Sequence, residues 1–177
     1  MRLVLLFIIF YSGQLAAQSG VYDISIPGIN GRTISMSDYK GKKIIVAVVS
    51  PDNMQNGQLR YLDSIQLGNP SITIIVIPAT DFRGTNDSLE IEAVKKNAAL
   101  HVVVASADGV RKADAATQNR LVRWLTSSSE NTHFDMDVAT DNQLYVISES
   151  GVLYAVLEKG VSPGVIIQLL KQDDIKQ

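Results

Sequence analysis

Cysteine is absent from all 177 residues of the chain. This absence excludes disulfide bonds, thiolate metal ligands and every reaction that needs a thiol nucleophile. A domain without disulfides must derive its stability from its hydrophobic core. Hydrophobic residues make up 46% of the sequence, which is sufficient for a globular domain and argues against disorder.

Strong charge and common catalytic motifs are scarce as well. The formal net charge is −2 and no long run of one sign is present, so the composition predicts no binding to nucleic acid. The two histidines, His101 and His133, lie far apart and lack the spacing of metal ligands. Neither a Gly-x-Ser-x-Gly motif nor a phosphate-binding glycine loop occurs. Hydrolase and nucleotide-binding functions are therefore not predicted.

The first 17 residues differ in character from the rest. Arg2 precedes an apolar run that starts at Leu3, and small residues end the segment at Ala17. This layout is typical of a secretory signal peptide, and the run is shorter than the roughly 20 residues that span a bilayer. We predict a signal peptide at residues 1–17, with an uncleaved anchor as the alternative, and a single domain at residues 18–177. The expected location is periplasmic or secreted, with no stable membrane insertion after cleavage.

Hydrophobic periodicity predicts alternating strands and helices after this leader. The first half contains a β-hairpin whose first strand begins at Val21 and whose turn is Asn30-Gly31, followed by a strand at 42–50 buried on both faces. A helix at 53–67 with Leu59, Leu62 and Ile65 on one face and a second buried strand at 71–79 come next. The second half contains a helix at 89–100 capped by Ser88, a short strand at 101–106, a helix with Leu121, Trp124 and Leu125 on one face, a hairpin at 142–160, and a last helix that begins at Ser162-Pro163.

This order of elements predicts an α/β fold. Strands separated by helices pair in parallel through right-handed crossovers, whereas the second hairpin adds antiparallel strands. We therefore expect a three-layer, thioredoxin-like arrangement, with a mixed central sheet, helices on both faces and an N-terminal β-hairpin.

Four stretches carry a resemblance to a known family: VYDISIPGINGRTISMSDYKGKKIIVAVVS, IPATDFRG, YVISESG and GVSPGVIIQLL. The first resembles the opening hairpin and first buried strand of the glutathione peroxidases. The second resembles their Phe-Pro-Cys-Asn-Gln-Phe-Gly-Gly loop, with matches at Pro78, Phe82 and Gly84. The others resemble a hairpin and a Thr-Ser-Pro helix start in the same family. The resemblance covers nearly all of the chain after the leader and implies a thioredoxin-like fold.

The resemblance also indicates where that family's catalytic groups would stand. It places the thiolate or selenolate at Asp52, with Asn53 as the alternative, a glutamine at Asp81, and a tryptophan and an asparagine at Thr140 and Asp141. In the family the nucleophile attacks the peroxide O–O bond while the other three groups donate hydrogen bonds. All four positions differ here. A carboxylate has no soft, polarisable lone pair, and an ionised Asp81 is an acceptor where a donor is needed.

The sequence leaves three hypotheses for function. In the first, the protein is an exported, glutathione-peroxidase-like pseudoenzyme that has lost peroxidase catalysis, needs no cofactor, and binds an unknown protein or small molecule. In the second, it is an active antioxidant enzyme of that family that responds to oxidative stress, although the missing sulfur argues against it. In the third, it binds a metal or small ligand at an acidic remnant, Asp52, Asp81 and Asp141, with His133, Asp135 and Asp137 nearby. The last stretch lacks the pattern of an EF-hand, so no residue is assigned as a metal ligand.

Overall fold

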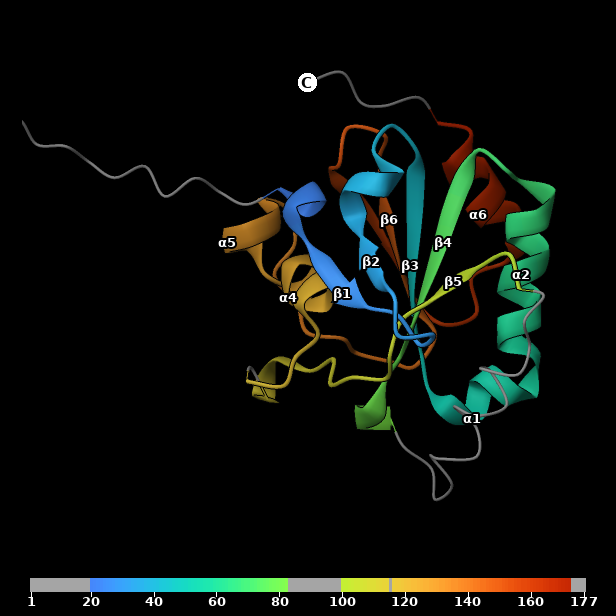
Figure 1. Ribbon diagram of the computed structural model, residues 1–177. Helices are drawn as coiled ribbons and strands as arrows, with labels where there is room; N and C mark the ends of the chain where they lie inside the picture. Colours follow the sequence, from blue (N-terminus) through green and yellow to red (C-terminus); the bar gives the residue numbers. More distant parts are fainter. Residues whose placement is uncertain (1–19, 83–99, 115, 173–177) are drawn as a thin grey trace, which may run out of the picture.

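The computed structural model describes residues 20–82, 100–114 and 116–172 (Figure 1). The strands are β1 (Ser25–Pro27), β2 (Thr33–Ser35), β3 (Lys43–Val49), β4 (Ile72–Pro78), β5 (Val103–Val104), β6 (Gln143–Ile147) and β7 (Leu153–Leu157). The α-helices are α1 (Pro51–Asn53), α2 (Leu59–Gly68), α4 (Arg120–Thr126), α5 (Ser128–Asn131) and α6 (Pro163–Leu170). Helix α2 continues from α1 through a π-helical turn, Met54–Gln58.

Five strands form the central sheet, in the order β5-β4-β3-β6-β7. Strand β3 pairs in parallel with β4 and antiparallel with β6, and β4 and β5 are also parallel. Every residue of β3 and β4 is buried, as the β-branched runs predicted. The second predicted hairpin is confirmed as β6 and β7, which are antiparallel.

Helices cover both faces of this sheet (Figure 1). Ile45, Ala47 and Val49 of β3 point to the face where α2 and α6 pack, and the core there includes Leu62 and Ile166. The alternate residues of β3 point to the opposite face, which α4 and the N-terminal hairpin cover. This alternation gives each face its own core. The predicted α/β three-layer architecture is therefore confirmed.

The N-terminal hairpin is present but shorter than the sequence predicted. Strands β1 and β2 form a separate two-stranded sheet around the turn, where Gly31 has a φ of 79°. The alternating pattern predicted that the first strand would begin at Val21, but Val21–Asp23 forms a 3₁₀ turn. The prediction of a strand start at Val21 was therefore wrong. The 3₁₀ turn buries both Val21 and Ile24 against the core, a pair of positions that an alternating strand would place on opposite faces.

The amino end of β3 is fixed by a buried lysine. The Nζ of Lys43 donates hydrogen bonds to the carbonyl oxygens of Leu170 (3.0 Å) and Gln172, at the end of α6. It also lies 3.7 Å from Oε1 of Glu149, in the turn between β6 and β7. A cation at this position suits the negative end of the α6 helix dipole. Lys43 therefore connects β3 with two segments that follow it by more than 100 residues.

Some predicted features lie outside the described residues. They include the leader at 1–17 and the helix at 89–100 with its cap at Ser88, so these remain predictions. Within the described ranges, no helix has both the length and the apolar character needed to cross a membrane.

Asp63, in α2, holds the chain where it enters β5. Its Oδ1 accepts the backbone N–H groups of His101 and Val102, the second at 3.1 Å, and its Oδ2 lies 3.3 Å from Nδ1 of His101. Burial by itself raises the pKa of Asp63. The backbone hydrogen bonds and the His101 ring outweigh burial and hold the pKa below its ordinary value of 3.8.

We expect Asp63 to make folding stability depend on pH in acid. Because the folded pKa lies below the unfolded value, the stabilisation is complete above the ordinary pKa and is lost as pH falls through the folded pKa. Asp63→Asn should cost about 1–2 kcal/mol at pH 7 and flatten this acid dependence. Urea unfolding between pH 3 and pH 7 measures both effects. The exposed Asp38→Asn serves as the control; an unchanged pH profile in Asp63→Asn contradicts the assignment.

Candidate functional site

The candidate site lies at the carboxyl end of β3. The turn Ser50–Asn53 follows β3, Asp81 follows the neighbouring β4, and Asp141 precedes β6 on the other side. Val49 is paired with Pro78, and the N–H of Asn142 donates to the Val48 carbonyl at 2.9 Å. The topology therefore brings these three segments, predicted from the sequence, to the same end of the sheet.

A carboxylate closes the turn after β3. Oδ1 of Asp141 accepts the backbone N–H of Ser50 at 2.6 Å, and Oδ2 accepts the Ser50 hydroxyl at 3.0 Å and the Asn53 side-chain amide. The Ser50 hydroxyl oxygen in turn accepts the N–H of Asn53 at 3.3 Å and caps the helix start. Three donors of the turn thus converge on one acidic side chain. Asp141 is a structural partner of the turn as well as one of the predicted site positions.

The helix that follows β3 begins at Pro51, earlier than the sequence pattern predicted. Ser50 occupies the N-cap and Pro51 the first helical position, so the chain turns into helix directly after the strand. The Ser50-Pro51 pair is a helix-start signal in the sequence that predicts this earlier start. The π-helical turn follows at once, and Gly57 within it has a φ of 97°. This left-handed conformation at Gly57 is one that glycine tolerates readily.

The two remaining predicted positions beside this turn have few contacts. Asp52 is half-buried and has no hydrogen bond or ion pair with any described residue. Thr140 is exposed, and its backbone N–H lies 3.4 Å from Oε1 of the buried Gln143, which also accepts the N–H of Ala139 at 2.8 Å. Gln143 therefore shapes the loop before β6, a role that the sequence pattern did not reveal.

Asp81 faces a different segment from Asp141. Its Oδ2 accepts the backbone N–H groups of Val110 and Arg111, the second at 2.9 Å. The Arg111 guanidinium lies over the Phe82 ring, with its central carbon 4.9 Å from the ring centroid. These contacts hold the loop at residues 108–111 against the end of β4. The Asp81 carboxylate acts here as an acceptor for backbone donors, in line with its expected chemistry.

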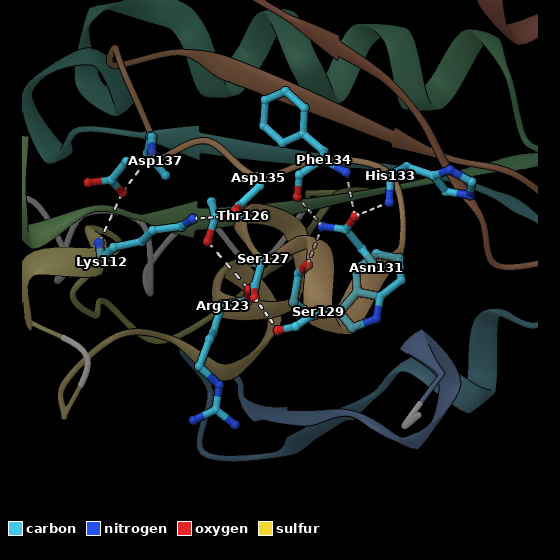
Figure 2. A network of polar contacts seen from close by, with 12 residues as sticks. Lys112, Arg123, Thr126, Ser127, Ser129, Asn131, His133, Phe134, Asp135 and Asp137 are labelled. Carbon is cyan, nitrogen blue, oxygen red and sulfur yellow. Dashed lines mark hydrogen bonds and ion pairs between the residues drawn. The ribbon is translucent and has the colours of Figure 1, made fainter. Parts of the chain in front are cut away.

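A second polar network occupies the segment between α5 and β6 (Figure 2). The buried Asn131 side chain donates to the carbonyls of Trp124 and Phe134 at 2.8 Å each and accepts the N–H groups of His133 and Phe134. Trp124 itself is buried in the core, as its place on the predicted helix face indicated. Asn131 thus uses both its donor and its acceptor capacity to fix the loop.

The acidic residues of this segment are paired with Lys112. The ammonium group of Lys112 contacts Asp135, and the backbone N–H of Lys112 donates to Oδ1 of Asp137 at 2.9 Å (Figure 2). Burial raises the pKa of the Tyr145 hydroxyl, and the charge of Asp137 raises this pKa further. Among residues 20–82, 100–114 and 116–172, no group of three or more histidine, cysteine or acidic side chains could hold a metal ion. The carboxylates of Asp52, Asp81 and Asp141, all of them described, are therefore not gathered into such a group.

Comparison with solved structures defines the class of fold. A crystal structure of Trgpx in its apo form has a TM-score of 0.62 and 15% sequence identity, and the alignment covers 86% of this chain and 93% of that one. A thiol:disulfide interchange protein of the thioredoxin family from Chlorobium tepidum TLS has a TM-score of 0.61 and 16% identity, with 88% and 96% covered. The chain therefore has a thioredoxin-like fold, as predicted.

Sequence comparison gives the relationship within that class. Over 78 residues the chain is 32% identical to glutathione peroxidase 1 of Caenorhabditis elegans, a match that covers 42% of this chain and 47% of the relative. The chain thus matches about half the length of this curated relative. No protein-family model matches the chain. Over these 78 residues the chain is homologous to a glutathione peroxidase, and it is a divergent homologue because it has no cysteine.

We expect Asp141 to be the residue on which the turn depends. Asp141→Ala leaves the three donors of Ser50 and Asn53 without their acceptor and should cost about 2–4 kcal/mol of folding stability. The Ser50 amide should also exchange with solvent faster. Urea unfolding and amide hydrogen exchange measure the two effects.

The matched control is Asp52→Ala, which removes a carboxylate from the same turn. Because Asp52 has no partner among the described residues, this change should stay within about 0.5 kcal/mol. Equal losses in the two variants contradict the role assigned to Asp141.

Proposed function

We propose that this protein is an exported, glutathione-peroxidase-related domain that has lost peroxidase catalysis and acts as a binding or interaction module. The observation that carries this proposal is the convergence of three donors of the turn on Asp141. The turn that holds the reactive sulfur in the related enzymes here holds no thiol, and the Asp141 carboxylate accepts three of its donors.

The chemistry of peroxide reduction supports the loss of activity. The reaction needs a polarisable nucleophile and nearby donors that stabilise the anion and the departing oxygen. Asp52 supplies no such nucleophile. The Asp81 carboxylate accepts backbone N–H groups of the loop at residues 108–111. The Asp141 carboxylate accepts donors of the turn after β3. The change from donors to acceptors therefore extends across the site and is not confined to one residue.

The proposal of a binding role rests on what the site retains. Asp52 is a half-buried carboxylate without a partner among the described residues, and it lies just after a strand that is buried on both faces. Such a group favours ligands that donate hydrogen bonds or carry positive charge. The partner is an unknown protein or small molecule. Export is proposed from the signal-peptide character of residues 1–17 and implies a periplasmic or secreted location.

A working antioxidant enzyme is the second candidate. It is favoured by the 32% identity over 78 residues to a protein named glutathione peroxidase 1. The two candidates differ in one measurable property, which is catalytic turnover of peroxide.

We expect the purified protein to show no turnover with hydrogen peroxide and either glutathione or thioredoxin as reductant. The physical reason is the absence of any thiol in the chain. The assay follows oxidation of the reductant over many equivalents, with heat-denatured protein as the control. Turnover above that control contradicts the proposal and favours the enzyme.

Restoring sulfur alone should not restore activity. In Asp52→Cys the new thiol lies in the same turn as the Asp141 carboxylate, which disfavours a thiolate, and each missing donor is worth about 10²–10³ in rate. Turnover should therefore remain near that of the unmodified chain in the same assay. Asn53→Cys tests the alternative nucleophile position, and its peroxide turnover should also remain near that of the unmodified chain. Substantial turnover from either variant contradicts the conclusion that the whole site has changed.

A further inference from the structure

Sulfur chemistry in this protein is confined to methionine. Of the four methionines in the sequence, Met36, Met54 and Met136 lie within the described residues. Met36 is completely buried and Met54 is 5% exposed, whereas Met136 is 58% exposed. Among the described residues, Met136 is therefore the methionine that is exposed to solvent.

The loop around Met136 keeps this side chain at the surface. Asp135 is bound by the Lys112 ammonium, and Oδ1 of Asp137 accepts the N–H groups of Lys112 and Val138 at 2.9 and 2.8 Å (Figure 2). Both neighbours of Met136 are thus tied to the body of the domain. Met136 lies between these two anchored residues, is exposed, and belongs to neither hydrophobic core.

We propose that Met136 is a modification site for hydroperoxides. The thioether sulfur attacks one oxygen of hydrogen peroxide, the O–O bond breaks, and an S–O bond forms. Sulfur is oxidised by two electrons to the sulfoxide, and the peroxide is reduced to one molecule of water after proton transfer. Hydrogen peroxide is uncharged, so the flanking carboxylates of Asp135 and Asp137 do not repel it.

This oxidation is stoichiometric. The chain has no thiol that could reduce the sulfoxide, so each Met136 consumes one equivalent of peroxide unless a separate methionine sulfoxide reductase restores it. Because the thioether is exposed, the added oxygen removes no packing contact. Oxidation of Met36 or Met54 requires local opening and would place a polar oxygen in a core. The inference does not depend on the proposed binding role.

The test is peptide-level mass spectrometry of the folded full chain after timed exposure to hydrogen peroxide. The peptide that contains Met136 should gain one oxygen at least about tenfold faster than those with Met36 and Met54. In denaturant the three rates should converge. Met136→Leu should remove the fast phase and leave the slow ones unchanged.

Two results overturn the proposal. One is oxidation of Met36 or Met54 in the folded protein as fast as that of Met136. The other is a fall in the thermal midpoint of protein oxidised only at Met136, since that would show a packed thioether. Failure of this test is distinguishable from failure of the proposed function. This test measures oxidation of one methionine by one equivalent of peroxide without a reductant, whereas the peroxidase assay measures repeated turnover with a reductant.

Discussion

The burial of strand β3 on both faces is the constraint on which the domain depends. Its neighbours β4 and β6 satisfy its backbone, and its alternate side chains enter two separate cores. Such a strand can meet polar groups only at its ends. At the amino end Lys43 binds the carbonyls that end α6, and at the carboxyl end the turn after β3 binds Asp141. Each end of the strand is thus closed by one charged side chain.

The antiparallel pairing of β3 with β6 explains why Asp141 reaches the turn. In that pairing the chain just before β6 lies beside the chain just after β3, so position 141 faces position 50 whatever side chains stand there. The parallel neighbour β4 delivers Asp81 to the same end of the sheet, where it binds the loop at residues 108–111. The fold therefore determines which segments meet, and the side chains determine what chemistry is available.

The buried strands and the second hairpin followed from periodicity, because burial on one or two faces leaves a repeating local pattern, and the order of elements predicted a mixed sheet. The order of the strands within the sheet was not predicted. The segments that carry the predicted site positions lie at one end of the sheet because each of them follows or precedes a strand. The side chains of Asp81 and Asp141 nevertheless bind different segments. The polar partnerships were not predicted. Ser50 and Asp141 are 91 residues apart, and Asp63 and His101 are 38 apart, so their hydrogen bonds leave no local pattern. The 3₁₀ turn at Val21 was missed because its buried residues resemble the alternation of a strand.

The hydrogen bonds between Asp141 and the turn suggest a reason why the nucleophile position and the donor positions both depart from the pattern of the glutathione peroxidases. A turn with free donors at a helix start favours an anion, and a thiolate in such a place is stabilised by them. Here the Asp141 carboxylate already accepts three of the donors of Ser50 and Asn53. An added thiolate would meet a like charge, and an external acceptor would compete with Asp141 for these donors. Asp52 keeps a carboxylate that has no hydrogen bond or ion pair with any described residue. On the binding role proposed above, we therefore expect a ligand at this end of the sheet to supply hydrogen-bond donors or positive charge, whereas a site with free donors favours anions.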